Sequence, residues 1–332
     1  MAMTDGVVEQ MQGEAEEPRL MHFPVTFFAA VMGLAGFGLA TRQIELALDL
    51  PFTASRLVIG ATALVFLAIA VFFIAKGLRY PAALRAEWNH PVRIAFFPAI
   101  TIGVLLISAG LLPVSEPLAR GLWCAATVAH LAVTLGVVSA WISHRPFEQA
   151  HLTPAWFIPA VGNVLVPVAG VRLGYVEVSW FFFSVGILFW LVFLTLVFNR
   201  LIFHNPLPER LLPTLVILIA PPSAGFIAWQ EINGGALDPL ARVLYYVAVM
   251  FVLILLTQVH RLFRLPFTMS WWAYSFPLAA FTIASAHFGT RTGSEFHMAA
   301  MYATYAVLAV VIALLLVKTG RGILRGEICR PE

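Results

Sequence analysis

The chain has 332 residues, of which 61% are hydrophobic and only 11% are charged, with a formal net charge of +3. Soluble domains carry roughly a quarter charged residues, so this composition excludes an ordinary soluble protein. The small net charge gives no reason to expect a nucleic-acid partner. The two cysteines, Cys124 and Cys329, are too few for a disulfide framework or a thiolate metal site.

Apolar runs long enough to cross a hydrocarbon core of roughly 30 Å recur along the chain. They fall near residues 23–41, 55–78, 92–111, 117–142, 154–172, 177–203, 211–230, 237–262, 268–288 and 296–319. We therefore predict an all-α integral membrane protein with ten transmembrane helices, in a channel domain over residues 22–320. Residues 1–21 are acidic and lack the apolar segment of a signal peptide, so they are expected to form a cytoplasmic tail, and residues 321–332 a basic one.

Lysine and arginine counts predict the orientation of these spans. Ten spans place both termini on one side of the membrane, and the side with more basic residues is cytoplasmic by the positive-inside rule. We therefore expect both termini in the cytoplasm of a bacterial inner membrane, with basic ends that contact anionic lipid headgroups. Only six of the twenty basic residues fall on the opposite side: Arg42, Arg56, Arg120, Arg172, Arg242 and Arg291.

The spans fall into two populations. Even-numbered spans are bulky and apolar on every face, as in residues 180–203. Odd-numbered spans are rich in proline, glycine, alanine, serine and threonine, and small residues let helices approach closely. A proline inside a span frees a backbone carbonyl, which only protein or a water-filled cavity can satisfy. We therefore predict that the odd helices are inner and the even helices are outer.

Proline and glycine recur at similar distances within the odd-numbered spans. Pro24, Pro98, Pro213 and Pro277 are each followed by a glycine twelve residues later, and Pro159 by one eleven residues later. Five helical hairpins in a quasi-five-fold arrangement would produce such a repeat. The alternative is that proline and glycine are simply frequent in membrane helices.

The inner spans carry no Asp, Glu, Lys or Arg at mid-depth. Coupled carriers usually place an ionisable group there, at a cost of roughly 3 kcal/mol or more, and cation channels use carboxylate rings. We therefore predict a neutral pathway in which hydroxyl, amide and aromatic groups solvate a weakly hydrated anion. The candidate pore-lining residues are the five prolines, the bulky residues before them and nearby polar side chains: Phe23, Pro24, Thr26, Phe97, Pro98, Thr101, Ile158, Pro159, Asn163, Leu212, Pro213, Ser223, Pro277 and Thr282.

No arrangement of side chains in the sequence indicates an enzyme, a cofactor or a metal site. Nucleophile-elbow, phosphate-loop and HExxH motifs are absent. His287 and His297 flank a turn without acidic residues at metal-ligand spacing. His130, in the middle of an even-numbered span, is expected to make a structural hydrogen bond to a neighbouring helix.

The run WWAYSFP over residues 271–277 is the most distinctive motif. It places the ring of Phe276 one residue before Pro277, about halfway through an inner helix. Two interpretations are open. The aromatic residues could fill packing grooves, or Phe276 could project into the lumen, where a ring would narrow and dewet the pore.

With the runs FPVTFF at 23–28 and MGLAG at 32–36, this motif resembles the slow-type anion channel and tellurite-resistance/dicarboxylate transporter family. The resemblance covers nearly the whole chain. It implies a homotrimer of independent pores, each with five proline-kinked inner helices and five outer ones. It also implies selectivity for small monovalent anions and occlusion by Phe276, and it places Ala29 near that ring, where some relatives have glycine.

Two functions follow as the leading hypotheses. The neutral pathway and the ring before Pro277 favour a passive channel for small monovalent anions, closed or nearly closed by Phe276. The alternative is a secondary transporter that exports an oxyanion such as tellurite or a C4-dicarboxylate, for which an arginine or lysine is expected in the pathway. A scaffold protein without flux would not need kinked helices of small residues.

Overall fold

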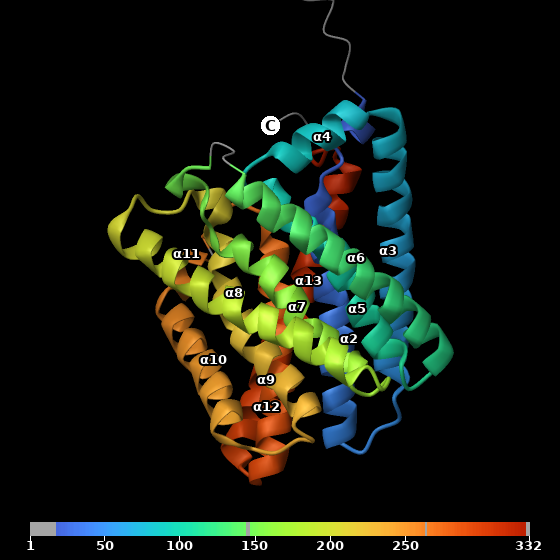
Figure 1. Cartoon of the computed structure of the whole chain (residues 1–332), viewed down its shortest axis with the longest axis vertical. Helices are drawn as coiled ribbons and strands as arrows, with labels where there is room; N and C mark the ends of the chain where they lie inside the picture. The colour runs from blue at the N-terminus through green and yellow to red at the C-terminus, as the bar shows by residue number, and fades with distance from the viewer. Residues whose placement is uncertain (1–17, 144–146, 263, 330–332) are drawn as a thin grey trace, which may run out of the picture.

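The computed structural model describes residues 18–143, 147–262 and 264–329, and within these ranges the secondary structure is helical, without strands. Residues 1–17 of the predicted acidic tail and residues 330–332 of the predicted basic tail lie outside the described residues. The remaining chain forms one bundle of helices (Figure 1).

Consecutive long helices pack against each other as five pairs. The pairs are α2 (Phe28–Ala47) with α3 (Thr53–Arg79), α5 (Pro98–Leu111) with α6 (Glu116–Ile142), α7 (Phe157–Gly170) with α8 (Val176–Phe203), α9 (Ala220–Ile232) with α10 (Pro239–Thr257), and α12 (Ser275–Thr292) with α13 (Glu295–Leu324). Shorter elements are α4 (Pro81–Asn89), α11 (Val259–Leu262), η1 (Arg19–His22) and η4 (Gln149–His151).

The first helices of these pairs contact one another in order. α2 touches α5, α5 touches α7, α7 touches α9, α9 touches α12, and α12 touches α2 again. Burial separates them from their partners. The most apolar stretches of α2, α5 and α9, each with its preceding turn, are 67%, 72% and 83% buried, whereas those of α3, α6, α8, α10 and α13 are between 17% and 33% buried. The second helix of each pair therefore carries the exposed apolar surface.

Eight helical segments of the described residues are long and apolar enough to cross a membrane, where ten were predicted. The other two are the shorter segment Pro154–Gly170, which contains α7, and the segment of η7 (Met269–Tyr274) and α12. Serine, threonine and histidine side chains make α12 less apolar. Because nearly every residue of α7 and most of α12 before its exposed last turn are buried against other helices, these two helices need little lipid-compatible surface.

A stretch of 3₁₀ helix precedes each of α2, α5, α7, α9 and α12. These stretches are η2 (Val25–Phe27), η3 (Arg93–Phe96), η5 (Pro154–Trp156), η6 (Glu209–Ile219) and η7. The repeat prolines lie at or near these junctions, since Pro98 begins α5 and Pro277 is the third residue of α12. Proline is tolerated in the first turn of a helix because no N–H is needed there. The prediction that Pro277 lies halfway through its helix is therefore wrong.

A buried ion pair holds the beginning of the first long helix. Lys76 Nζ donates to Glu87 Oε2 at 2.7 Å and to the Phe23 carbonyl at 2.8 Å, while Glu87 Oε1 accepts the N–H of Val25 at 2.8 Å. Both charged side chains are almost fully buried. A buried pair of this kind is costly unless its remaining groups are hydrogen-bonded, and here they bond the chain just before α2. The pair thereby fixes where α2 starts relative to α3 and α4.

Candidate functional site

Two cavities lie among the helices that contact one another in the ring. The first, called the apolar pocket, has a volume of about 30 Å³ and is lined by Ala29, Met32, Phe96, Ile158, Val161, Ile217, Ala220, Trp272, Ala273, Phe276 and Pro277. The second, called the charged pocket, has a volume of about 180 Å³. Its wall is mostly aliphatic but includes Arg42, Gln43, Arg172, Glu231 and His287.

Both cavities use one face of each contributing helix. On α7, Ile158 and Val161 line the apolar pocket and Leu165 and Val168 line the charged pocket, which Arg172 also lines from the turn directly after α7. Steps of three and four residues keep side chains on one face of a helix. The same steps occur at 29–32–36–39–43 on α2, at 217–220–224–227–231 through α9, and at 273–276–280–283–287 through α12. The two cavities therefore follow one axis.

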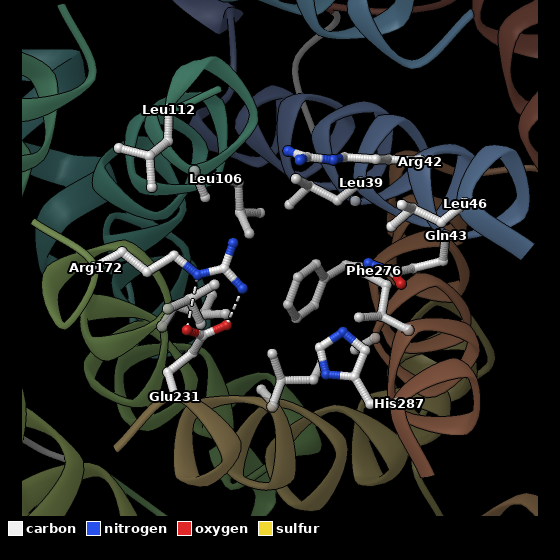
Figure 2. A pocket seen from close by; sticks show the side chains of 18 residues that line it. Leu39, Arg42, Gln43, Leu46, Leu106, Leu112, Arg172, Glu231, Phe276 and His287 are labelled. Carbon is white, nitrogen blue, oxygen red and sulfur yellow. Dashed lines mark hydrogen bonds and ion pairs between the residues drawn. The ribbon is translucent and has the colours of Figure 1, made fainter. Parts of the chain in front are cut away.

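Phe276 lines both cavities, and no other residue of the described chain is shared by the two. Its side chain is 6% exposed. The ring packs directly on the backbone of α2, because a Cβ added at Gly36 would stand 3.4 Å from Phe276 Cδ2. Viewed from the charged pocket, the ring lies in the middle of the opening (Figure 2). The ring thus separates the two cavities.

The other aromatic residues of the WWAYSFP run anchor the chain around Phe276. The Trp271 indole N–H donates to the Pro266 carbonyl at 3.0 Å, and that of Trp272 donates to Thr319 Oγ1 at 3.1 Å. The Tyr274 hydroxyl donates to the Leu262 carbonyl at 3.3 Å. The polar-tipped rings therefore bond surrounding segments, although Trp272 also lines the apolar pocket, whereas Phe276 lines both cavities.

The charged pocket contains one ion pair and one further cation. Arg172 Nε donates to Glu231 Oε2 at 2.8 Å, and a second guanidinium nitrogen bonds Oε1, so the pair is bidentate. Arg42 lies across the opening from this pair (Figure 2), with its guanidinium carbon 5.2 Å from the centre of the Phe52 ring. No carboxylate of the described residues forms an ion pair with Arg42. Cation–π contact rather than a counter-charge therefore holds this arginine.

The turn after α9 holds Glu231 at the mouth of the pocket. Asp238 caps α10 by accepting the N–H of Ala241 at 2.8 Å, and it also accepts the indole N–H of Trp229 at 2.9 Å. Hydrogen bonding to the Ala241 N–H holds the pKa of Asp238 below its usual range. Since Trp229 belongs to the last turns of α9, this contact connects the end of α9 to the start of α10.

The predicted pore-lining residues divide into two groups. Ala29, Ile158 and Pro277 line the apolar pocket together with Phe276, and Ala29 is the residue that the family resemblance places near the ring. The others line neither pocket: Phe23, Pro24, Thr26, Phe97, Pro98, Thr101, Pro159, Asn163, Leu212, Pro213, Ser223 and Thr282. The ring of Phe97, for example, packs against Phe73 of α3 and Trp88 of α4.

The predicted polar residues make hydrogen bonds within and between helices. Thr101 Oγ1 bonds His130 Nδ1 of α6 at 2.7 Å, which confirms the structural role expected for His130. Thr282 Oγ1 bonds Thr304 of α13 at 3.0 Å, and Asn163 Nδ2 donates to the Pro159 carbonyl at 2.7 Å. These side chains are turned away from the stripes that line the cavities. The walls of both cavities are mainly apolar, and the expectation of a hydroxyl-lined pathway stays a prediction.

Arg42, Arg172, Glu231 and His287 are absent from the predicted site residues. The predicted first span ends at residue 41, whereas α2 continues to Ala47 and carries Arg42 on its last turns. The other three fall at the predicted ends of spans or in turns. Arg172, Glu231 and His287 each follow a cavity-lining residue by four positions, but this spacing indicates a shared face only once the structure shows which face lines the cavity.

Comparison with known proteins agrees with this architecture. The model of the SLAC1 family, described as voltage-dependent anion channels, matches residues 22–320. The chain is 26% identical to an uncharacterized transporter of Methanocaldococcus jannaschii over 94% of this chain and 98% of the relative. It is 29% identical to a tellurite resistance protein TehA homolog of Haemophilus influenzae, over 77% and 78% of the two chains.

Plant channels are also similar over most of this chain. The S-type anion channel SLAH3 of Arabidopsis thaliana is 26% identical over 91% of this chain and 48% of its own length, so the chain spans about half the length of this plant channel. The match of the family model over nearly all of the helical bundle establishes that the chain is a multi-pass membrane protein of the SLAC1 family of anion channels and transporters, the family that its WWAYSFP motif resembles.

Proposed function

We propose that the chain is a channel for small monovalent anions in which Phe276 closes the passage between the charged pocket and the apolar pocket. The observation that carries this proposal is that one side chain lines both cavities, and that side chain is a ring packed against the backbone of the neighbouring helix α2. Removal of the ring would join the two cavities along one axis.

The chemistry of the apolar pocket suits a gate. Its volume of about 30 Å³ offers room for only about one or two water molecules, and none of its wall residues is charged. An anion that enters must lose most of its hydration there, and apolar constrictions close pores by dewetting. A pathway without a deep ionisable group also binds an anion weakly enough for the anion to leave.

The proposed topology has ten crossing helices as five hairpins in a quasi-five-fold arrangement, with α2, α5, α7, α9 and α12 inside and their partners outside. The closed order of contacts and the contrast in burial support it. We place the protein in a bacterial inner membrane with both termini in the cytoplasm, where the charged pocket opens on the opposite side. A homotrimer is proposed from the family resemblance.

Current through purified protein in planar bilayers tests the proposal. The unaltered protein is expected to pass little chloride current, and Phe276→Ala at least about tenfold more, because the hydrophobic barrier is removed. Phe281→Ala is the matched control: Phe281 lies five residues further along α12, is buried to a similar extent and faces Tyr245 rather than either cavity. Equal currents in Phe276→Ala and Phe281→Ala, with both proteins folded, would exclude the gate.

A secondary exporter of an oxyanion or dicarboxylate is the second candidate, and the presence of two arginines in the charged pocket favours it. A channel gives a current that rises linearly with anion concentration and ignores a proton gradient. An exporter saturates, and its flux follows the pH difference across the membrane. Flux from proteoliposomes, measured over a range of chloride, tellurite and succinate concentrations with and without a pH step, separates the two.

A further inference from the structure

We propose that the charged pocket is a binding site for one small monovalent anion, that Arg42 is its binding cation, and that Arg172 acts by neutralising Glu231. On this inference, which rests on the proposed channel function, the fixed charges of the pocket set the preference for anions over cations, whereas Phe276 sets only whether the passage is open. Three observations carry it.

The first observation is the position of Arg42. Its side chain is half-buried in the wall of the pocket, held over the Phe52 ring. The acidic residue nearest in sequence, Glu45, forms no ion pair with Arg42 among the described residues: its Oε1 accepts the N–H groups of Ala54 at 2.8 Å and Ser55 at 3.2 Å at the start of α3, and its Oε2 makes no hydrogen bond. The guanidinium donors of Arg42 therefore remain available to an anion in the pocket.

The second observation is the pairing of the one carboxylate in the wall. Glu231 is mostly buried, and both of its oxygens accept from Arg172. A bidentate pair of this kind fixes the geometry of both side chains and cancels their charges. Leaving histidine aside, the wall carries two arginines and one glutamate, so Arg42 supplies its net positive charge.

The third observation is the position of this charge relative to the barrier. The pocket ends on the ring of Phe276, and beyond the ring the wall is apolar. A cleft of low dielectric that carries one sign of charge raises the local concentration of counter-ions and their rate of association by factors of about ten to a thousand. An anion bound beside Arg42 therefore lies in the cavity that ends on the ring, while a cation is repelled. A single charge suits a monovalent ion that must leave again.

A charge series in the Phe276→Ala background tests the inference by conduction. The measurement is the chloride-to-sodium permeability ratio, from the reversal potential across a salt gradient. Arg42→Gln and Arg172→Gln are each expected to lower the ratio about tenfold. Glu231→Gln is expected to raise it, and the double variant Arg172→Gln/Glu231→Gln to return it to the parent value. An Arg42→Gln ratio equal to that of the parent would overturn the proposal.

Two controls separate charge from structural damage. Arg42→Lys keeps the charge and is expected to stay within about twofold of the parent. Arg242→Gln removes an exposed arginine that lines neither cavity, and it is expected to leave the ratio unchanged. A loss in Arg242→Gln as large as that in Arg42→Gln would mean that total charge, and not the pocket, sets selectivity.

Binding can be tested without conduction. Crystals of the protein with Phe276 intact are soaked in sodium bromide, and the anomalous signal of bromide is located. A peak beside Arg42 that persists in Arg42→Lys and disappears in Arg42→Gln supports the site. No peak in the pocket, or the same peak in Arg42→Gln as expected for an adventitious ion only, overturns it. If bromide binds in the pocket but Phe276→Ala passes no chloride current, the channel function is refuted and the anion site stands. If Phe276→Ala passes current, but no bromide peak is found and the charge variants leave the permeability ratio unchanged, only the anion site is refuted.

Discussion

The apolar pocket and the charged pocket are built by the same helix faces, and both walls are mainly apolar, but only one of them carries charged side chains. Along α7 and the turn after it, the two are joined by one stripe in which Val161 lines the first pocket and Arg172 the second, eleven residues or about three helical turns later. The apolar pocket is small and has no charged wall residue, whereas the charged pocket is larger and carries an ion pair and a further arginine. This difference shows that one face of a helix can line both an apolar constriction and, further along, a charged cavity that can concentrate ions.

The largest expected effect comes from moving a charge from one pocket to the other. Ile217 and Ile227 are both 6% exposed and lie on successive parts of the same segment, the first in the apolar pocket and the second in the charged pocket. Ile217→Asp should lower stability by roughly 3 kcal/mol or more, because no cation lines the apolar pocket. Ile227→Asp should cost clearly less, because Arg42 and Arg172 line the same pocket. Thermal unfolding in detergent measures both, and equal losses would contradict the contrast.

A smaller effect is expected where α2 meets α12. A Cβ added at Gly33 would lie 2.0 Å from Ser275 Oγ, directly before Phe276. Gly33→Ala should therefore destabilise the protein by about 1–3 kcal/mol through overpacking. Gly60→Ala on α3 is the matched control, since a Cβ there meets nothing within 4 Å, and it should gain roughly 0.5–1 kcal/mol. Similar melting temperatures for the two variants would argue against the close contact.

The smallest effect on transport is expected at Thr101. The sequence predicts that Thr101 lines the pore, because it is a polar residue in an odd-numbered span. In the structure its hydroxyl bonds His130 on α6. Thr101→Val leaves the buried histidine nitrogen without a partner, which should cost about 1–3 kcal/mol of stability. Chloride current in the Phe276→Ala background should nevertheless remain within about twofold of the parent. A large fall in current with stability unchanged would restore Thr101 to the pathway.

Much of the fold and the identity of the ring could be predicted from the sequence. Apolar run length indicates the helices. The family resemblance singles out Phe276, because Phe23 and Phe97 also precede repeat prolines and yet line neither cavity. The lining of the cavities could not be predicted from these polar residues, because Thr101 and Thr282 bond neighbouring helices and Asn163 donates to a backbone carbonyl of its own helix. A set of polar residues does not show which face of a helix each one occupies.

The charged pocket escapes prediction for a related reason. Charges near the ends of apolar runs, such as Arg42 and Glu231, suggest loop residues, yet both helices continue and turn these side chains inward. The end of an apolar run marks where lipid contact ends, not where the helix ends. The steps of three and four residues from Ile217 to Glu231 show that these side chains share one face of the helix. Only the packing of the helices decides which face lines a cavity.

A graded series at position 276 tests the central claim most directly. Chloride current through equal amounts of folded protein is measured for phenylalanine, Phe276→Leu, Phe276→Val and Phe276→Ala. If the ring alone separates the two pockets, current rises in that order as side-chain volume falls, while Phe281→Ala stays at the level of the unaltered protein. Currents that do not follow the size of residue 276, or that rise equally in Phe281→Ala, would contradict the claim that Phe276 closes the passage.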